Sequence, residues 1–384
     1  IGDPIEPPGP ASTSSSPNKW YLIFGSGPTD IGTAASTQKA RLFAYDLADL
    51  ASGRASLLTI DGARVTTGPF NTGAGYEEVN ENNTFVGDPV VIDFDVDMKA
   101  EAIYFGTVGD ATADDGSIWR IAIGEEPDPG NWGSAKRLLD ANKPFISQAS
   151  ITVDEKFQTW IMAGTGRLYV NADKTSITEQ TLYGFIDENP AVGDNASNLS
   201  PTIADLIVTT NTIVRTNGDV DLDGDGSVDT TFDALKVTVE TAGGWQRHYT
   251  TNAPDPSQRS VNRSTLIDGV LFNTAFTPST DLCTSEGTSI LLGLAFNTGT
   301  ALPNPIFGEI PCAGCPAGVS ESSPFVDLGA GLASTPSIHI GDQDIPGKVT
   351  VITQKSTGAI DTTDATTLGG IANGEITWRE YRTF

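Results

Sequence analysis

A three-strand unit at Val86–Ile123 restricts the possible folds of this chain more than any other feature of its sequence. The unit contains a β-branched run at Val90–Phe94, a second run at Ala102–Gly106 that ends on glycine, and a strictly alternating segment at Gly116–Ile123. Runs of this length, rich in Val, Ile and aromatic residues and separated by polar turns, predict neighbouring β-strands.

Looser copies of this unit occur along the rest of the chain. In each copy a first strand is followed by a polar loop and by a second strand, often with an aromatic residue beside a charged one. The paired segments are Tyr21–Gly25 with Arg41–Asp46, Thr159–Gly164 with Thr181–Asp187, Val270–Phe276 with Ser289–Phe296, and Val349–Thr353 with Gly374–Arg379. About five weak repeats at irregular spacing are typical of a radial β array, so we predict an all-β fold, a modified β-propeller of about seven irregular blades with long loop insertions.

Composition divides the chain into a linker and one domain. Residues 1–18 are rich in proline and serine and have no periodic apolar pattern, so we expect a linker there and the propeller domain at residues 19–384. The linker-like start suggests a processed part of a longer protein, and the alternative is a short mature chain with a frayed terminus. The 41 glycines and 23 prolines fit many turns. We expect little helix beyond a possible single turn within Arg41–Leu58.

The charge of the chain limits its partners. A formal net charge of -27 argues against nucleic acids and anionic membrane surfaces, because both require clustered Lys and Arg. Divalent cations are the natural partners of such an acidic chain, although acidity can also serve only to keep a secreted β protein soluble. No apolar run is long enough to span a bilayer, so we predict no transmembrane segment.

An acidic stretch at Thr216–Thr230 has the spacing of a calcium loop. Its carboxylates stand at the first, third, fifth and ninth positions of the loop, at Asp221, Asp223, Asp225 and Asp229. Gly226 stands where the chain must turn sharply, and the carbonyl of Ser227 would supply the seventh position. Phe232 occupies the twelfth position, where an EF-hand has Glu. These oxygen ligands predict a Ca²⁺ site outside an EF-hand, and the alternative is a solvated acidic loop.

The sequence also predicts the flanks of this loop and allows a second register. Thr210–Arg215 and Ala234–Val239 look like strands, which would place the loop at the tip of a hairpin. A competing register begins two residues earlier and puts a hydroxyl in the ninth position, where a carboxylate serves better. It would use Asp219, Asp221, Asp223, Gly224 and Ser227.

A second acidic cluster lies within the three-strand unit and predicts a weaker metal site. Its carboxylates have the same spacing, at Asp93, Asp95, Asp97 and Glu101. Met98 replaces the turn glycine, which removes the easy left-handed turn. The alternative is a strand edge whose outward carboxylates discourage pairing with other chains.

The three cysteines are candidates for a disulfide in a chain that looks exported. Cys312 and Cys315 form a CxxC segment without the residues needed for haem attachment or a zinc site. We predict that Cys283 pairs with Cys312 or Cys315 and so ties down the connection Asn297–Ala330. The third cysteine would remain for a partner or as a reactive thiol.

Sequence patterns for catalysis are missing. The chain has no GxSxG elbow, no phosphate-binding GxxxxGK motif and no dinucleotide fingerprint. Its two histidines, His248 and His339, each lie on an alternating segment where a structural role is usual. We therefore predict no enzyme activity and no catalytic residue.

Three segments resemble the C-terminal propeller of the PilC/PilY family of type IV pilus tip-associated proteins. They are VGDPVVIDFDVDMKAEAIYFGT with GSIWRI, FNTAFTPSTDLCTSEGTSILLGLAFNTG at Phe272–Gly299, and GEITWRE at Gly374–Glu380. The resemblance implies a modified seven-bladed propeller, exported to the cell surface, with a calcium loop that governs pilus extension and retraction. It places that loop at Asp93–Glu101, whereas the better-formed loop of this chain is at Asp221–Asp229.

The resemblance leads to one main hypothesis and two alternatives. The main hypothesis is a non-enzymatic calcium-binding propeller that acts in pilus biogenesis and cell adhesion at the extracellular pilus tip, after export through the periplasm. Its implied partners are pilins, minor pilins or other extracellular filament subunits, and its own N-terminal adhesive portion. The alternatives are a periplasmic quinoprotein-type propeller dehydrogenase and a passive structural subunit of an extracellular filament.

Overall fold

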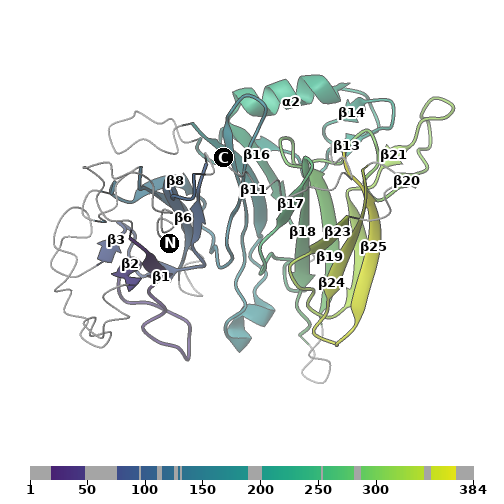
Figure 1. The fold of residues 1–384 in the computed structure, drawn as a ribbon. Coiled ribbons are helices and arrows are strands. Elements are labelled where there is room, and N and C mark those ends of the chain that lie inside the picture. Colours follow the sequence, from purple (N-terminus) through teal and green to yellow (C-terminus); the bar gives the residue numbers. More distant parts are fainter. Residues whose placement is uncertain are drawn as a thin grey trace, which may run out of the picture.

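A computed structural model describes most of the chain as a series of antiparallel sheets (Figure 1). It describes residues 19–47, 76–94, 97–109, 115–124, 129, 132–188, 201–251, 254–280, 287–340 and 347–368. Within these residues no helix is long and apolar enough to cross a membrane.

Five blade-like sheets follow one another along the chain. The first has β1 (Tyr21–Gly25), β2 (Arg41–Asp46) and β3 (Tyr76–Glu78), and the second has β4 (Phe85–Val86), β5 (Val90–Ile92), β6 (Ala102–Val108), β7 (Ser117–Ala122) and β8 (Lys136–Asp140). The third has β9 (Ser150–Val153), β10 (Thr159–Gly164), β11 (Thr181–Asp187), β12 (Ile207–Val208) and β16 (Gly244–His248). The fourth has β17 (Thr265–Ile267), β18 (Val270–Thr277), β19 (Thr288–Ala295) and β22 (Phe325–Ala330), and the fifth has β23 (Ser337–Ile340), β24 (Lys348–Gln354) and β25 (Ile360–Thr366).

Smaller elements lie at the ends of these strands. One small sheet has β13 (Ile213–Val214), β14 (Asp219–Asp221) and β15 (Thr230–Thr231), and the other is the hairpin of β20 (Glu309–Ile310) and β21 (Glu321–Ser322). Within the part of the chain that the structure describes, the helices are α2 (Phe232–Thr241) and a 3-10 helix at Asn171–Thr175. Figure 1 shows α2 at one end of the strands, on the side where β13, β14, β20 and β21 also lie.

The sheets pack face to face from β1–β3 to β23–β25 (Figure 1). A buried apolar cluster fills each space between consecutive sheets of the described chain. Every residue of the central strands β6, β7, β10 and β11 is buried, because their sheets are covered on both faces. Packing of whole sheets against one another is the arrangement expected of propeller blades.

The central strands agree closely with the sequence prediction. Strands predicted from the repeated unit lie where the pattern placed them, namely β1, β2, β5, β6, β7, β10, β11, β18, β19 and β24. The outer strands β4, with two residues, and β8, with the sequence KRLLD, show no apolar alternation, and the prediction missed them. The predicted linker at 1–18 and the predicted strand Gly374–Arg379 lie outside the described residues.

The prediction of a strand at Ala234–Val239 is wrong, because these residues form the middle of α2. Thr231 caps the helix, with its side-chain oxygen accepting a hydrogen bond from the backbone N–H of Ala234. Leu235 and Val239 are four residues apart, so both point to the same side, and both are buried. The β-branched residues of this segment suggested a strand, but burial of this apolar pair on the third sheet favours the helix.

Candidate metal centres

The better-formed acidic loop, residues Asp221–Asp229, lies at the tip of the hairpin of β14 and β15. These strands pair Asp219 with Thr231 and Val220 with Thr230, so the loop lies at the tip of a hairpin as predicted. The strands of that hairpin are β14 and β15, however, and not the predicted flanks Thr210–Arg215 and Ala234–Val239. Gly226 has a φ of 94°. This left-handed conformation suits glycine, which has no Cβ to clash.

Three carboxylates of this 221–229 loop converge. Oxygen atoms of Asp221, Asp223 and Asp225 all lie within 4.8 Å of one another. Asp221 is fully buried and is held by two backbone N–H donors, from Gly224 and Gly226, at 2.7 Å each. The other two carboxylates are exposed. The buried Asp221 is therefore fixed in place, and the exposed pair faces solvent from which a cation can enter.

The remaining predicted ligands of the 221–229 loop lie outside the group of three converging carboxylates. Asp229 lies outside the group of three, and its Oδ2 accepts a hydrogen bond of 2.9 Å from the N–H of Leu222. Ser227 donates its backbone N–H to Asp225 at 2.7 Å, and hydrogen bonds from Ser227 lower the pKa of the Asp225 carboxyl. Asp219, from the competing register, accepts a hydrogen bond from the Asn217 amide at 2.7 Å and is not in the group.

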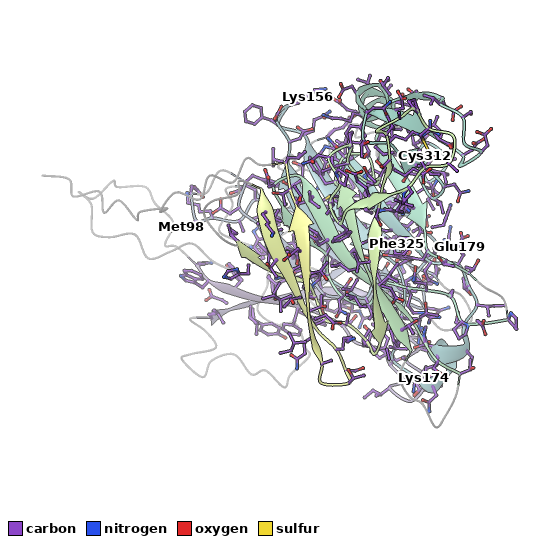
Figure 2. The ribbon with its side chains drawn as sticks, turned by 90° about the vertical axis from the view of Figure 1, so that its right-hand side faces the viewer. Met98, Lys156, Lys174, Glu179, Cys312 and Phe325 are labelled. Carbon is purple, nitrogen blue, oxygen red and sulfur yellow. A yellow bond between two sulfur atoms is a disulfide. The ribbon has the colours of Figure 1, made fainter. Side chains whose placement is uncertain are left out.

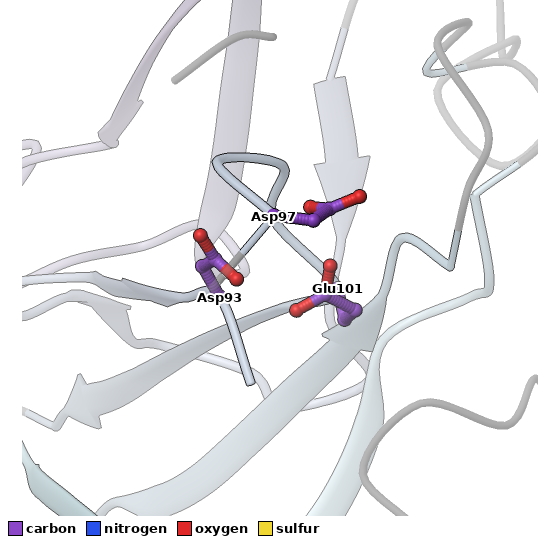
Figure 3. A group of neighbouring side chains, drawn as sticks. All are labelled: Asp93, Asp97 and Glu101. Carbon is purple, nitrogen blue, oxygen red and sulfur yellow. The ribbon is translucent and has the colours of Figure 1, made fainter. Parts of the chain in front are cut away.

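The second acidic cluster forms a loop, residues Asp93–Glu101, at the tip of the hairpin of β5 and β6. Figure 3 shows Asp93, Asp97 and Glu101 turned toward one another, with oxygen atoms that lie within 4.8 Å of each other. The alternative of a strand edge is wrong, because β5 ends at Ile92 and the described residues of the loop turn back to β6. Asp95 lies outside the described residues.

The two loops share four hydrogen bonds, although they belong to different sheets. Counting loop positions from Asp221 or Asp93 as position 1, the carboxylate at position 1 accepts from the N–H at position 6. The carboxylate at position 5 accepts from the N–H at position 7, and the carboxylate at position 9 accepts from the N–H at position 2. The N–H at position 9 donates to the carbonyl of the residue before the loop. In the 221–229 loop these donors and acceptors are Gly226 to Asp221 at 2.7 Å, Ser227 to Asp225 at 2.7 Å, Leu222 to Asp229 at 2.9 Å and Asp229 to Val220 at 2.9 Å. In the 93–101 loop they are Met98 to Asp93 at 2.8 Å, Lys99 to Asp97 at 2.8 Å, Phe94 to Glu101 at 2.6 Å and Glu101 to Ile92 at 2.9 Å. The shared spacing of carboxylates therefore gives the described residues of both loops the same four hydrogen bonds.

The 93–101 loop differs from its counterpart in two ways that weaken it as a cation site. Met98 has a φ of 71° at the position of the turn glycine, and its side chain is 67% exposed at the edge of the molecule (Figure 2). Lys99 places its Nζ 3.4 Å from an oxygen of Asp97. A bound cation would have to compete with this ammonium group for the carboxylate.

Replacement of Met98 by asparagine is expected to stabilise the protein by about 1 kcal/mol, because asparagine adopts the left-handed conformation far more readily than methionine. The exposed side chain contributes little packing that could be lost. Denaturant unfolding measures the change. Met98→Ala is the matched control, since alanine keeps the strain, and equal stability of the two variants would show that the turn is not strained.

The predicted pairing of Cys283 is wrong, because Cys312 and Cys315 form a disulfide with each other, with Cα atoms 5.5 Å apart. The described residues that flank Cys283 lie where β18 ends and β19 begins, whereas Cys312 follows the other end of β19. The eight residues of β19 separate the two regions. Cys283 itself lies outside the described residues.

His248 lies near a hydroxyl and a carboxylate but does not form a proton relay. Its Nδ1 is 3.1 Å from the Thr181 hydroxyl and 2.9 Å from the Glu179 carboxylate. A relay needs one partner on each ring nitrogen, and here both contact the same one. Burial lowers the pKa of His248, and the charge of Glu179 opposes that effect.

The packed antiparallel sheets place the chain in the β-propeller class. Among solved structures it is similar to the C-terminal domain of PilY1 from Pseudomonas aeruginosa, with a TM-score of 0.53 and 17% sequence identity over 90% of this chain and 69% of that chain. Neither a family model nor a curated protein sequence matches the chain. At this level of identity the similarity confirms the all-β, propeller-like fold that the sequence and the PilC/PilY resemblance predicted. The described residues form five blade-like sheets, and the number of about seven blades stays a prediction.

Proposed function

We propose that this chain is a non-enzymatic, calcium-binding propeller domain of a type IV pilus tip-associated protein, where it acts in control of pilus assembly and retraction and in surface adhesion. The observation that carries this proposal is the pair of hairpin loops with the same hydrogen bonds around converging carboxylates. The similarity of fold to a domain of PilY1 supports the pilus assignment.

The donors in both loops favour calcium over other metals. All of them are oxygen atoms, which suit hard cations, and the loops contain no histidine or cysteine that would favour zinc. Flexible loops with several carboxylates suit the larger, adaptable coordination of Ca²⁺ better than the strict octahedron of Mg²⁺. Asp221, Asp223 and Asp225 would hold the ion in the 221–229 loop, with the Ser227 carbonyl and Asp229 as further ligands.

Calcium would act by relieving repulsion within each loop. Three carboxylates within 4.8 Å repel one another, and a divalent cation removes that repulsion. Occupied loops would stiffen the two hairpin tips, and so change surfaces available to pilins, minor pilins or the protein's own N-terminal adhesive portion. Because calcium is abundant outside cells, the state of the loops would report export to the cell surface.

The test of the pilus assignment is a deletion strain of the source bacterium that is complemented with the natural protein or with loop variants. We expect deletion to reduce surface pili, the natural protein to restore them, and Asp223→Asn with Asp225→Asn to alter extension or retraction. Unchanged pilus number and retraction in the deletion strain would contradict the assignment. An absorbance band of a bound quinone in the purified protein would contradict the non-enzymatic role.

A further inference from the structure

The Cys312–Cys315 disulfide lies in a hairpin that has little else to stabilise it. Two residue pairs, Glu309 with Ser322 and Ile310 with Glu321, form the whole ladder of β20 and β21. Both residues of β20 are exposed, as are most residues around the half-buried cysteines. A hairpin with so short a ladder and so few apolar contacts is marginal by itself, so we expect the disulfide to contribute much of its local order.

This hairpin contacts the module that contains the 221–229 loop. Glu321 forms an antiparallel bridge with Arg215, next to β13. The N–H of Thr216 donates to the Ser320 carbonyl at 2.9 Å, and the N–H of Ser320 donates to the Thr216 hydroxyl at 3.1 Å. Figure 1 shows β20 and β21 beside β13 and β14 at the same end of the molecule.

Arg215 connects this contact to the loop itself. Its side chain is buried, and its Nη2 donates to the carbonyl of Gly226 at 2.7 Å. The N–H of Gly226 in turn donates to Asp221, the buried carboxylate of the candidate calcium site. A single residue therefore joins the backbone of the cysteine hairpin to the turn that orients the first ligand. The sequence showed no sign of this role, because it depends on the pairing of Arg215 with Glu321, which is distant in the sequence.

We propose that Cys312–Cys315 is a site of thiol–disulfide exchange, and that its redox state sets the calcium affinity of the 221–229 loop. The calcium part of this inference rests on the proposed function. An external dithiol supplies two electrons and two protons. One of its thiolates attacks a sulfur of the disulfide, the other cysteine leaves as a thiolate, and the second thiol of the reductant resolves the mixed disulfide.

The expected effect of reduction follows from the contacts. The disulfide closes a ring of four residues, so it removes less chain entropy from the unfolded state than a long-range bridge, and its loss should not unfold the domain. It should loosen the two-pair hairpin and the contacts of Glu321 and Ser320 with the loop module. Arg215 would then hold the Gly226 turn less firmly, and calcium would have to order the turn on binding. Linkage requires the converse, that bound calcium makes the disulfide harder to reduce.

The test is calcium titration of the full chain in the oxidised state, after reduction by dithiothreitol, and as the Cys312→Ser, Cys315→Ser variant. All samples carry Cys283→Ser, so that no other thiol takes part in exchange. Asp97→Asn with Glu101→Gln removes the 93–101 loop as a binding site and leaves only the 221–229 loop. We expect its affinity to fall by at least about fivefold on reduction and in the double serine variant, at the lower end of measured couplings.

Two control variants help to decide between the outcomes. Asp223→Asn with Asp225→Asn leaves only the 93–101 loop, whose affinity should not respond to reduction. Thr216→Val removes the hydroxyl that accepts from Ser320 and should reduce the redox response. Equal affinities of oxidised and reduced protein, with an unchanged circular dichroism spectrum, would overturn the coupling but leave the proposed function intact. Absence of calcium binding in the oxidised protein would overturn both.

Discussion

Replacement of Asp187 by alanine is expected to lower the free energy of unfolding by about 3–5 kcal/mol, the usual cost of removing one partner of a buried ion pair. Asp187 on β11 and Arg120 on β7 have side chains that are 1% and 2% exposed, with Arg120 Nη1 at 2.7 Å from one carboxylate oxygen. Tyr104 on β6 donates its hydroxyl to the same carboxylate at 2.8 Å. Because these strands belong to the second and third sheets, the substitution removes a carboxylate that joins two blades and leaves the guanidinium buried without it.

Matched variants separate the lost charge from the lost packing. The double variant Arg120→Met, Asp187→Leu should recover most of the stability, since a buried apolar pair of similar volume has no charge that must be neutralised. Tyr104→Phe should cost only about 1 kcal/mol, the net value of one hydrogen bond. Burial, and then the charge of Asp187, raise the pKa of Tyr104, so its hydroxyl should stay protonated in all measurements. Denaturant unfolding gives the values, and a loss below about 1 kcal/mol for Asp187→Ala would show that the pair does not hold the sheets together.

Removal of calcium is expected to lower the melting temperature by several degrees. A ligand that binds only the folded protein adds about 2.7 kcal/mol of stability at 100 times its dissociation constant. Asp223→Ala with Asp225→Ala should lose most of this increment and keep the fold, because both side chains are exposed. Differential scanning calorimetry with calcium and with a chelator measures the change in melting temperature.

The corresponding change in the other loop is expected to matter less. Asp97 already has Lys99 beside it, and Met98 makes the turn less favourable, so Asp97→Ala should remove a smaller calcium-dependent increment. Asp95→Ala, at a residue outside the described part of the chain, should have the same small effect on stability as Asp97→Ala. The reverse order, with the 221–229 variant unchanged and the 93–101 variants insensitive to calcium, would show that the 93–101 loop is the main site.

The sequence predicted those parts of the fold whose pattern is local. Strands such as Thr159–Gly164 and Thr181–Asp187 were found because β-branched and aromatic residues mark a buried strand without reference to the rest of the chain. The same signal failed at Ala234–Val239, where β-branched residues occupy a helix. There the decisive features are the Thr231 cap and the burial of Leu235 and Val239, which depend on tertiary contacts.

In the candidate site, too, local features could be predicted from the sequence and contacts between distant residues could not. Carboxylate spacing alone predicted that Asp221, Asp223 and Asp225 would converge, because alternate residues of a tight loop face one point. It also predicted the 93–101 cluster, although it did not show that Met98 adopts a positive φ at the position of the missing glycine. The support by Arg215 and the pairing of Cys312 with Cys315 could not be predicted, because the first depends on distant strands and the second on the course of the chain between β18 and β20.

Isothermal titration of the oxidised full chain with calcium tests the central claim most directly. We predict binding at both acidic loops, with the tighter event lost in Asp223→Ala, Asp225→Ala and the weaker one lost in Asp97→Asn, Glu101→Gln. Absence of binding, or binding that persists unchanged when both loops carry these substitutions, would contradict the account.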